Sequence, residues 1–260
     1  MILALSIGNS LLRIGAMEGE RVLAEVSAST RTDRSADEYA CLLRSLLALR
    51  GIDPKDADGA IVASVVPPVT ERITRALTEL VGKPPRLLGC GMKTGLNIRI
   101  EDPGQLGGDL VASAVGAAAG YPLPLLVIDA DVATTFSVLG ADGAFLGCAI
   151  APGVAVSADA LARAASLLPS VASGAPTRAI GTTTAESLRS GSLYGTAAMI
   201  DGMIDRMEAE LGMPFASIVA SGEARPDLLS HCRHTIAYDP TLALRGLARI
   251  YHKNIKYKNK

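Results

Sequence analysis

The stretch LALSIGNSLLRIGAMEGE, residues 3–20, decides the fold. Two apolar segments flank Gly8-Asn9-Ser10, and a turn of this composition between apolar runs predicts a β-hairpin. The backbone N–H groups of such a turn can bind a phosphate. Phosphate-binding hairpins of this shape often carry a carboxylate that holds a metal, but here the first strand ends in Ser6. The stretch is therefore a nucleotide site, the remnant of one, or a plain hairpin.

The same pattern recurs in the second half of the chain. Residues 124–150, PLLVIDADVATTFSVLGADGAFLGCAI, again read as strand, polar turn, strand, acidic-glycine turn and strand. No short repeat period is present, which argues against a solenoid. We expect an internal duplication with two related α/β lobes that face one another across a cleft, each contributing a hairpin turn to it.

Further elements follow each hairpin. Ser35 with Glu38, and Thr183 with Glu186, predict capping boxes at two helix starts. Small residues make up most of the segment 105–122, which predicts either a helix that lets neighbouring backbones approach closely or a tightly packed core helix. The predicted strands are 2–8, 11–17, 21–28, 59–67, 85–91 and 216–224, and the predicted helices are 35–51, 70–82, 105–122, 157–168, 183–212 and 240–254.

Composition narrows the class of protein. The chain has 260 residues, 49% of them hydrophobic, which is enough for one large domain or two moderate ones. Its formal net charge is −1, so no overall basicity favours a nucleic-acid partner, and the lysines of the C-terminal YHKNIKYKNK are interpreted as a solvated terminus. The N-terminus lacks the features of a signal peptide and no apolar run is long enough for a bilayer, so we expect no membrane partner.

The cysteines predict a compartment. None forms a CxxC pair, which in a chain of this length is typical of reduced thiols in a cytoplasmic protein. The segment SHCRH, residues 230–234, could mimic a metal site, but a polar surface segment is the favoured interpretation. The four cysteines are Cys41, Cys90, Cys148 and Cys232.

Eight short stretches carry a resemblance through nearly the whole chain. In order they are SIGNS (6–10), ASVVPPV (63–69), DPGQLGGDL (102–110), VIDADVATTF (127–136), GCAIAPGVAVSADAL (147–161), IGTTTAESLRSGSLYG (180–195), IVASGEA (218–224) and LALRGLARIYHKN (242–254). Together they resemble the type III pantothenate kinases, members of the actin, sugar-kinase and Hsp70 ATPase superfamily. The resemblance implies a two-lobed α/β fold with duplicated ribonuclease H-like lobes and a central cleft.

The resemblance also implies a division of the chain. Residues 1–118 would form the N-terminal lobe with the first phosphate hairpin. Residues 119–260 would form the C-terminal lobe with the second phosphate motif and dimerisation helices, and the last helix could pack back between the lobes.

The first hairpin of the family reads Asp-x-Gly-Asn-Thr. By resemblance, Gly8, Asn9 and Ser10 would bind phosphate. Ser6 stands where the family has the Asp that helps to hold Mg²⁺. A neutral hydroxyl is a poor ligand for a hard divalent cation, so this position departs from the family's chemistry.

The family's Gly-Ala-Asp-Arg motif reads Gly107-Gly108-Asp109-Leu110 here. By resemblance, Asp109 is the general base and the two glycines contact the substrate. Taken alone, Asp109 would be interpreted as a helix cap. Leu110 cannot pair with a substrate carboxylate, and the lost charged hydrogen bond would weaken binding by roughly one to two orders of magnitude. Ile100 stands in place of an expected Tyr.

The family's second phosphate motif, Asp-x-Gly-Thr-Ala-Thr-Thr, covers residues 129–135. Asp129 matches the residue that the family uses near a monovalent cation, K⁺ or NH₄⁺. Thr134 and Thr135 match phosphate ligands. Asp131 replaces a glycine and adds bulk and negative charge, and Val132 also departs from the motif.

Three further stretches bear on the nucleotide and the substrate. The family's Thr-Gly-Gly reads Ser221-Gly222-Glu223, so the last glycine is lost while Ser221 and Gly222 would still bind nucleotide. Pro152 and Gly153 match the family's nucleotide-side APG sequence. Thr184 matches a residue that reaches pantothenate from the partner subunit, which implies a homodimer.

The resemblance implies ATP-dependent phosphorylation of pantothenate in coenzyme A biosynthesis, with Mg²⁺ and a monovalent cation. Two alternatives stay open because fold does not fix function: a catalytically impaired paralogue with a regulatory or binding role, and another phosphotransferase or nucleotide hydrolase. We hypothesise that Asp131 restores, from the second lobe, the carboxylate missing at position 6. The departures from the family fall on Ser6, Ile100, Leu110, Asp131, Val132 and Glu223.

Overall fold

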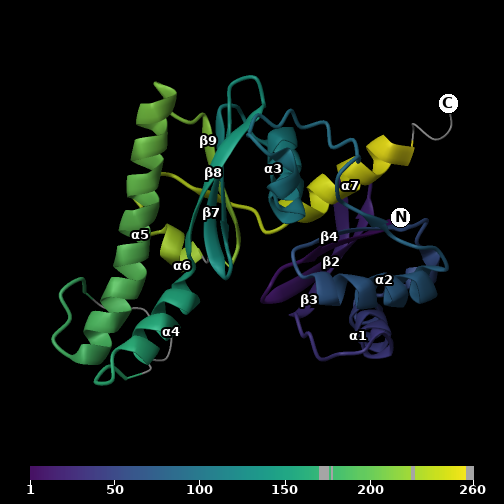
Figure 1. Ribbon diagram of the computed structural model, residues 1–260, viewed down its shortest axis with the longest axis horizontal. Helices are drawn as coiled ribbons and strands as arrows, with labels where there is room; N and C mark the ends of the chain where they lie inside the picture. The colour runs from purple at the N-terminus through teal and green to yellow at the C-terminus, as the bar shows by residue number, and fades with distance from the viewer. Residues whose placement is uncertain (170–175, 177, 224–225, 256–260) are drawn as a thin grey trace. The chain divides into compact units, whose positions relative to one another are not determined.

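The computed structural model describes residues 1–169, 176, 178–223 and 226–255 (Figure 1). The chain forms two compact units. The first comprises Met1–Tyr121, Gly143–Gly147 and Thr241–Lys260, and the second comprises Pro122–Asp142 and Cys148–Pro240. The lobes expected at 1–118 and 119–260 stay a prediction. Three lysines of the C-terminal tail, Lys256, Lys258 and Lys260, lie outside the described residues.

The first unit is built on a five-stranded sheet of order β3-β2-β1-β4-β5. The hairpin and the strand after it pair antiparallel, as their alternating sequence predicts, and β4 and β5 extend the sheet in parallel. The strands are β1 Ile2–Ile7, β2 Leu11–Glu18, β3 Arg21–Ser29, β4 Ala60–Ser64 and β5 Arg86–Leu87.

Two strands of this sheet are shorter than predicted. The strand expected at 59–67 ends at Ser64, whose hydroxyl accepts a hydrogen bond of 3.1 Å from the Val66 N–H. Pro67 then begins α2 (Pro67–Val81), three residues before the expected start, because proline suits the first position of a helix. The strand expected at 85–91 is reduced to β5.

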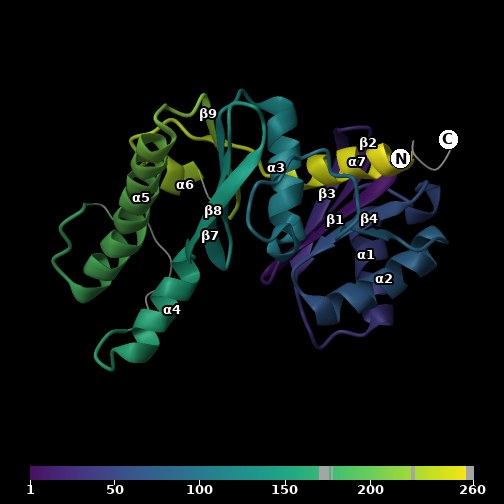
Figure 2. The same ribbon diagram turned by 45° about the horizontal axis from the view of Figure 1, so that its top comes forward.

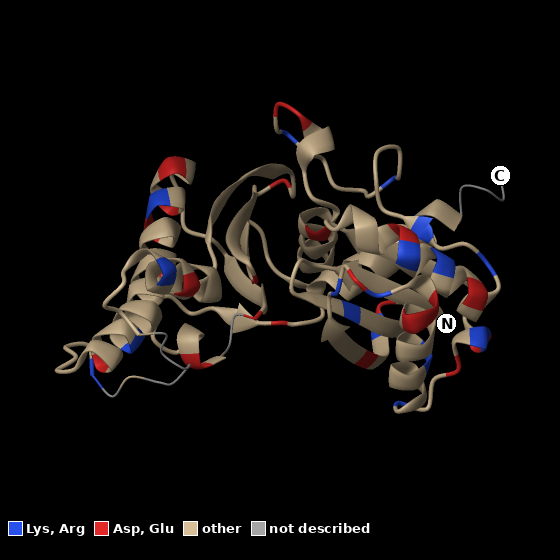
Figure 3. Cartoon of the chain, turned by 60° about the horizontal axis from the view of Figure 1, so that its bottom comes forward, with Lys and Arg blue, Asp and Glu red and all other residues tan. Residues whose placement is uncertain are grey.

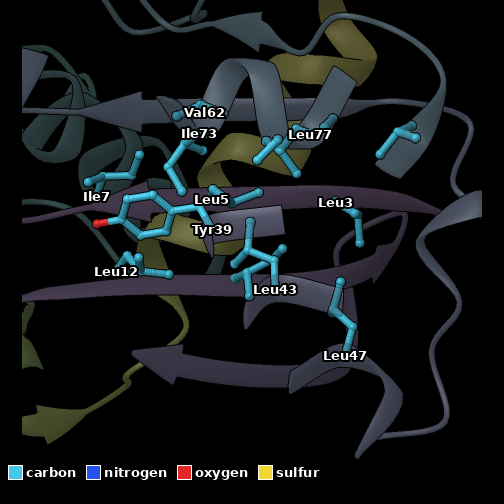
Figure 4. Packing of buried hydrophobic residues seen from close by; sticks show 14 of the residues in the cluster. Leu3, Leu5, Ile7, Leu12, Tyr39, Leu43, Leu47, Val62, Ile73 and Leu77 are labelled. Carbon is cyan, nitrogen blue, oxygen red and sulfur yellow. The ribbon is translucent and has the colours of Figure 1, made fainter. Parts of the chain in front are cut away.

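One face of the first sheet is covered by α1 (Ala36–Ala48) and α2 (Figure 2). Both bonds of the predicted capping box of α1 are present, between Ser35 and Glu38. Side chains of the two helices pack on the apolar face of β1, and Figure 4 shows Tyr39 and Leu43 beside Leu5. The 3₁₀ helix η1 (Pro54–Asp56) connects α1 to β4.

The other face is covered by α3 (Gly108–Gly120) and α7 (Leu242–Ile255), which pack extensively on each other. Their backbones approach at two glycines: a Cβ on Gly246 would overlap the carbonyl oxygen of Ala112, and a Cβ on Gly116 would overlap that of Leu242. The close approach expected of the small-residue helix is confirmed. The 3₁₀ helix η2 (Pro103–Gln105) precedes α3.

The second unit carries a sheet of order β10-β9-β6-β7-β8. Read from its other end, β8-β7-β6-β9-β10, it repeats the topology of the first sheet, so the internal duplication predicted from the sequence is confirmed. The strands are β6 Leu125–Ala130, β7 Ala133–Leu139, β8 Phe145–Pro152, β9 Ser217–Gly222 and β10 Ala237–Tyr238.

The helices of the second unit are α4 (Val154–Ala164), α5 (Thr184–Leu211) and α6 (Pro226–Leu229). The start expected for α4 at residue 157 is wrong by three residues, since the helix begins directly after Gly153. The predicted capping box of α5 forms in altered form. Thr183 accepts the Glu186 N–H, whereas the Glu186 carboxylate accepts the Thr182 N–H at 2.9 Å.

Candidate functional site

The turn of the first hairpin is held in place from outside the hairpin. Gly8 N–H donates 2.9 Å to the Leu11 carbonyl and closes the turn. The Thr30 hydroxyl donates 2.8 Å to the Gly8 carbonyl, and the Thr30 N–H donates 2.8 Å to the Ser10 carbonyl. Gly8, exposed Asn9 and Ser10 therefore lie together at the carboxyl end of β1, as the sequence predicts.

The first hairpin lies beside the helix that carries the predicted general base. Ser6 is half-buried and pairs in register with Arg13 on β2 and with Ala63 on β4. A Cβ on Gly108, the first residue of α3, would lie 3.7 Å from the Ala63 Cβ. The N-terminus of α3, with Asp109, is therefore one strand away from Ser6 within the same unit.

Asp109 is not the N-cap residue of its helix, but its side chain does accept a backbone N–H of the first turn. The N-cap is Gly107, which has no side chain to accept the free N–H groups. Asp109 follows in the first turn, where its Oδ1 accepts the Leu110 N–H at 2.9 Å. A carboxylate here interacts favourably with the helix dipole. Its role as a general base stays a prediction.

The second hairpin repeats this arrangement with different side chains. Asp129 pairs in register with Thr135, and the Asp131 N–H closes the turn with 2.9 Å to the Ala133 carbonyl. Asp129 therefore occupies in the second sheet the position that Ser6 holds in the first. The equivalent rows across the two sheets are Arg13, Ser6 and Ala63 in the first and Thr135, Asp129 and Ser221 in the second.

The comparison of these rows identifies Arg13, which is absent from the sequence-based predictions. The first row carries a cation where the second carries Thr135, and it carries a hydroxyl where the second carries a carboxylate. Counting residues outward from both ends of the turn pairs Ser6 with Arg13, and this count could have identified Arg13 from the sequence. The two hairpins thus differ in charge although their backbones are duplicated.

Two oxygen atoms converge beside Asp129. Gly222 has a φ of +75°, a conformation that favours glycine, and it ends β9 next to β6. A Cβ on Gly222 would overlap both the Asp129 Oδ1 and the Ala130 carbonyl oxygen. Oxygen donors of this kind suit a hard cation, so the residues present fit the monovalent cation that the resemblance implies.

Asp131 and Thr134 carry buried oxygen atoms without a hydrogen-bond partner. These atoms are Asp131 Oδ1 and Thr134 Oγ1, and the Thr134 residue is 1% exposed. Leaving such an atom unpaired costs about 1–3 kcal/mol, so a bound cation or a donor from a ligand would be stabilising here. Among the described residues no non-glycine residue has a positive φ, so Asp131 replaces glycine without backbone strain.

The start of α4 lies against the second hairpin. The Gly153 N–H donates 2.9 Å to the Val132 carbonyl, and a Cβ on Gly153 would overlap the carbonyls of Asp131 and Val132. Pro152, the last residue of β8, precedes Gly153 and is exposed. Glycine at 153 is therefore needed for the helix to approach the hairpin, and both predicted residues lie beside it.

The remaining predicted positions are spread over the two units. Ser221 is buried at the end of β9, and the Glu223 N–H that follows donates to the Ala130 carbonyl. Thr184 is exposed at the first residue of α5. In the first unit, Leu110 and Ile100 are both half-buried.

The segment SHCRH is tied to α5 through Asp201, which is 4% exposed. Asp201 accepts the backbone N–H groups of Arg233 and His234, and its Oδ1 lies 2.9 Å from the His234 Nδ1. Burial, followed by the charge of Asp201, raises the pKa of Cys232 to about 11. Ser230, His231 and Arg233 are exposed, which agrees with the interpretation as a polar surface segment, while Cys232 and His234 are half-buried.

Asp201 is expected to make stability depend on acid pH. Burial alone would raise its pKa, but the hydrogen bonds from Arg233 and His234 outweigh that effect and lower it. The stabilisation is therefore present above the ordinary Asp pKa of about 4 and is lost as the pH falls through the lower folded pKa. Asp201→Asn should lower Tm at pH 7 by a few degrees, and the gap to the parent protein should narrow below pH ~4. Circular dichroism melts at both pH values test this, and a gap that stays constant contradicts it.

The charged residues of the described part of the chain are of mixed sign and form no large metal-binding cluster. Figure 3 shows Lys and Arg interspersed with Asp and Glu within each unit. In the described part of the chain, no group of three or more His, Cys, Asp or Glu side chains could hold a metal, and no helix is long and apolar enough to cross a membrane.

Comparison with known proteins decides the family. A family model described as type III pantothenate kinase matches residues 2–206, the range that contains both hairpins and α3. The chain belongs to the type III pantothenate kinase family. Curated members of this family from Roseiflexus castenholzii and Myxococcus xanthus are each 37% identical over 254 residues, covering 98% of this chain and 99% of theirs.

Solved structures support the fold of this family member. An activator of 2-hydroxyisocaproyl-CoA dehydratase from Clostridium difficile with bound ADPNP has a TM-score of 0.60 at 13% identity, covering 100% of this chain and 97% of its own. A ROK hexokinase from Thermus thermophilus has a TM-score of 0.52 at 14% identity, with 98% and 99% covered. The prediction of an α/β fold of the actin-like and sugar-kinase class, with two duplicated units, is confirmed.

Proposed function

We propose that this protein is an ATP-dependent kinase that transfers a phosphoryl group to pantothenate. The observation that carries the proposal is the placement of Asp109 at the start of α3, one strand away from the first phosphate hairpin. Family membership supports the same activity, because relatives that match 98% of the chain are named type III pantothenate kinase. A general base beside a phosphate-binding turn is the arrangement that phosphoryl transfer to a hydroxyl requires.

The proposed reaction transfers the γ-phosphoryl group of ATP to the pantothenate hydroxyl and the hydroxyl proton to Asp109. The pantothenate hydroxyl oxygen attacks the γ-phosphorus of ATP, and the bond between that phosphorus and the β–γ bridging oxygen breaks. Asp109 accepts the proton that the hydroxyl loses. The products are ADP and phosphorylated pantothenate. In the first unit, the turn N–H groups of Gly8, Asn9 and Ser10 would orient a phosphate. In the second unit, Thr134 and Thr135 would be phosphate ligands, as the family resemblance implies.

The second hairpin has the oxygen donors that Mg²⁺ prefers. Mg²⁺, when bound, neutralises phosphate charge. Support for a site at Asp131 comes from its buried and unpartnered Oδ1, whereas Ser6 offers only a hydroxyl at the first hairpin. Asp129 and the Ala130 carbonyl would hold the monovalent cation, because their oxygens converge beside Gly222.

The remaining assignments are also proposals. Gly107 and Gly108 would contact pantothenate with their backbone, Ser221 would contact the nucleotide, and Leu110 predicts weak binding of the substrate carboxylate. The exposure of Thr184 fits a contact with a second copy in a homodimer. All four cysteines are free thiols, which supports the expected cytoplasmic location.

An Asp131→Asn variant tests the magnesium site. Isothermal titration with ATP should show at least a 10-fold loss of affinity in the presence of Mg²⁺, and little change in the presence of EDTA, because only the metal-assisted binding uses the carboxylate. Asp159→Asn, on the exposed face of α4 in the same unit, is the matched control and should bind as the parent protein does. Equal Mg²⁺-ATP affinity in the parent protein and Asp131→Asn would remove Asp131 from the metal site.

A further inference from the structure

A single cation lies in the first hairpin. Arg13 is the only basic residue within residues 2–18, all of which the structure describes, and it pairs in register with Ser6. On its other side it pairs with Ser27 of β3. Two hydroxyl-bearing residues, Ser6 and Ser27, therefore flank the arginine, which is the third residue of β2 after the turn.

Arg13 is half-buried, on the sheet face that α7 covers. Two residues further along β2, on the same face, a Cβ on Gly15 would lie 2.9 Å from the Leu244 Cδ1 of α7. Helix α7 thus packs on the cross-strand pair Ala4–Gly15. On the same face, the next pair toward the hairpin turn is Ser6–Arg13. Arg13 therefore lies on the sheet face that α7 covers, one row closer to the hairpin turn than Gly15.

We propose that Arg13 binds a phosphate of the nucleotide at the first hairpin, next to the turn formed by Gly8, Asn9 and Ser10. The inference rests on the proposed function and deepens it by assigning a cationic group to the first phosphate hairpin. A guanidinium can bind two phosphate oxygens at once and keeps its charge at any physiological pH. It places positive charge beside Ser6, a position that offers no carboxylate for a metal ion.

One carboxylate on the same sheet face offers Arg13 a competing role. Glu25 lies two residues from Ser27 along β3 and opposite Gly15, so it is a diagonal neighbour of Arg13. A purely structural arginine would serve Glu25 and the stability of the sheet. A phosphate-binding arginine would affect nucleotide affinity. The two roles therefore differ in the quantity that a substitution changes.

Nucleotide titrations of Arg13 variants separate these roles. With ATP in EDTA, where no metal contributes, Arg13→Gln should bind about 10- to 100-fold more weakly than the parent protein. Arg13→Lys, which keeps the charge but loses the planar fork, should lie between the two. Arg21→Gln is the matched control, because Arg21 is exposed at the opposite end of the sheet, paired with Glu18. Melting curves establish that each variant folds.

The outcomes distinguish this inference from the function on which it rests. Weaker ATP binding by Arg13→Gln, with an unchanged Arg21→Gln, supports the phosphate contact. ATP affinity equal to that of the parent protein, with or without a lower Tm, overturns the inference and leaves the kinase proposal standing. A parent protein that binds no ATP with or without Mg²⁺ overturns both.

Discussion

An Asp109→Asn variant is expected to lose turnover by at least ~100-fold while it binds ATP as well as the parent protein. An amide cannot accept the proton of the substrate hydroxyl, and a positioned general base contributes typically 10²- to 10⁴-fold to the rate. Asn can still accept the Leu110 N–H through its side-chain oxygen, so the local structure of α3 should persist. The measurement is pantothenate-dependent ADP release, with ATP affinity from titration.

Asp102→Asn is the matched control for this substitution. Asp102 caps the short helix before α3, where its Oδ1 accepts the Gly104 N–H at 3.0 Å, and it is exposed. It should retain turnover within a few fold. Asp109→Asn with turnover close to that of the parent protein would show that another group accepts the proton.

A Gly246→Ala substitution is expected to give the largest loss of stability. The new methyl group would overlap the Ala112 carbonyl oxygen, which belongs to the backbone of α3 and cannot rotate away. The two helices would have to separate, and overpacking of this kind costs about 1–3 kcal/mol or more. In a chain of this size the cost corresponds to a Tm lower by roughly 2–12 °C.

Gly191→Ala is the control with the opposite sign. Gly191 lies within α5, and a Cβ there meets no atom within 4 Å. Alanine is a better helix former than glycine by about 0.5–1 kcal/mol, so this variant should melt at the same temperature or slightly higher. A Gly246→Ala protein that melts with the parent protein would contradict the close helix contact.

The duplicated hairpins could be predicted because their signals are local. Alternating apolar residues on both sides of Gly8-Asn9-Ser10 specify a hairpin without knowledge of the rest of the chain, and the same holds for residues 124–150. The shared order of the two sheets follows from that repetition. Helix starts were less accurate. Pro67 and Gly153 begin helices through backbone properties that the apolar pattern does not contain.

The residues absent from the sequence-based predictions are identified by strand pairing and side-chain contacts rather than by a motif. Arg13 is a candidate because the strand register places it beside Ser6. Ser6 in turn pairs with Ala63, which lies near the start of α3. Asp201 organises the segment around His234 from a helix more than thirty residues away. A motif comparison identifies positions that match a pattern, and neither of these residues belongs to one.

Formation of phosphorylated pantothenate by the purified protein tests the central claim most directly. The protein is incubated with ATP, Mg²⁺, K⁺ and pantothenate, and both ADP and the phosphorylated product are quantified by mass spectrometry. The account predicts equal amounts of both products, with ADP release that depends on pantothenate and is lost in Asp109→Asn. No phosphorylated pantothenate at any substrate concentration, from a folded protein, would contradict the claim and favour a non-catalytic member of the family.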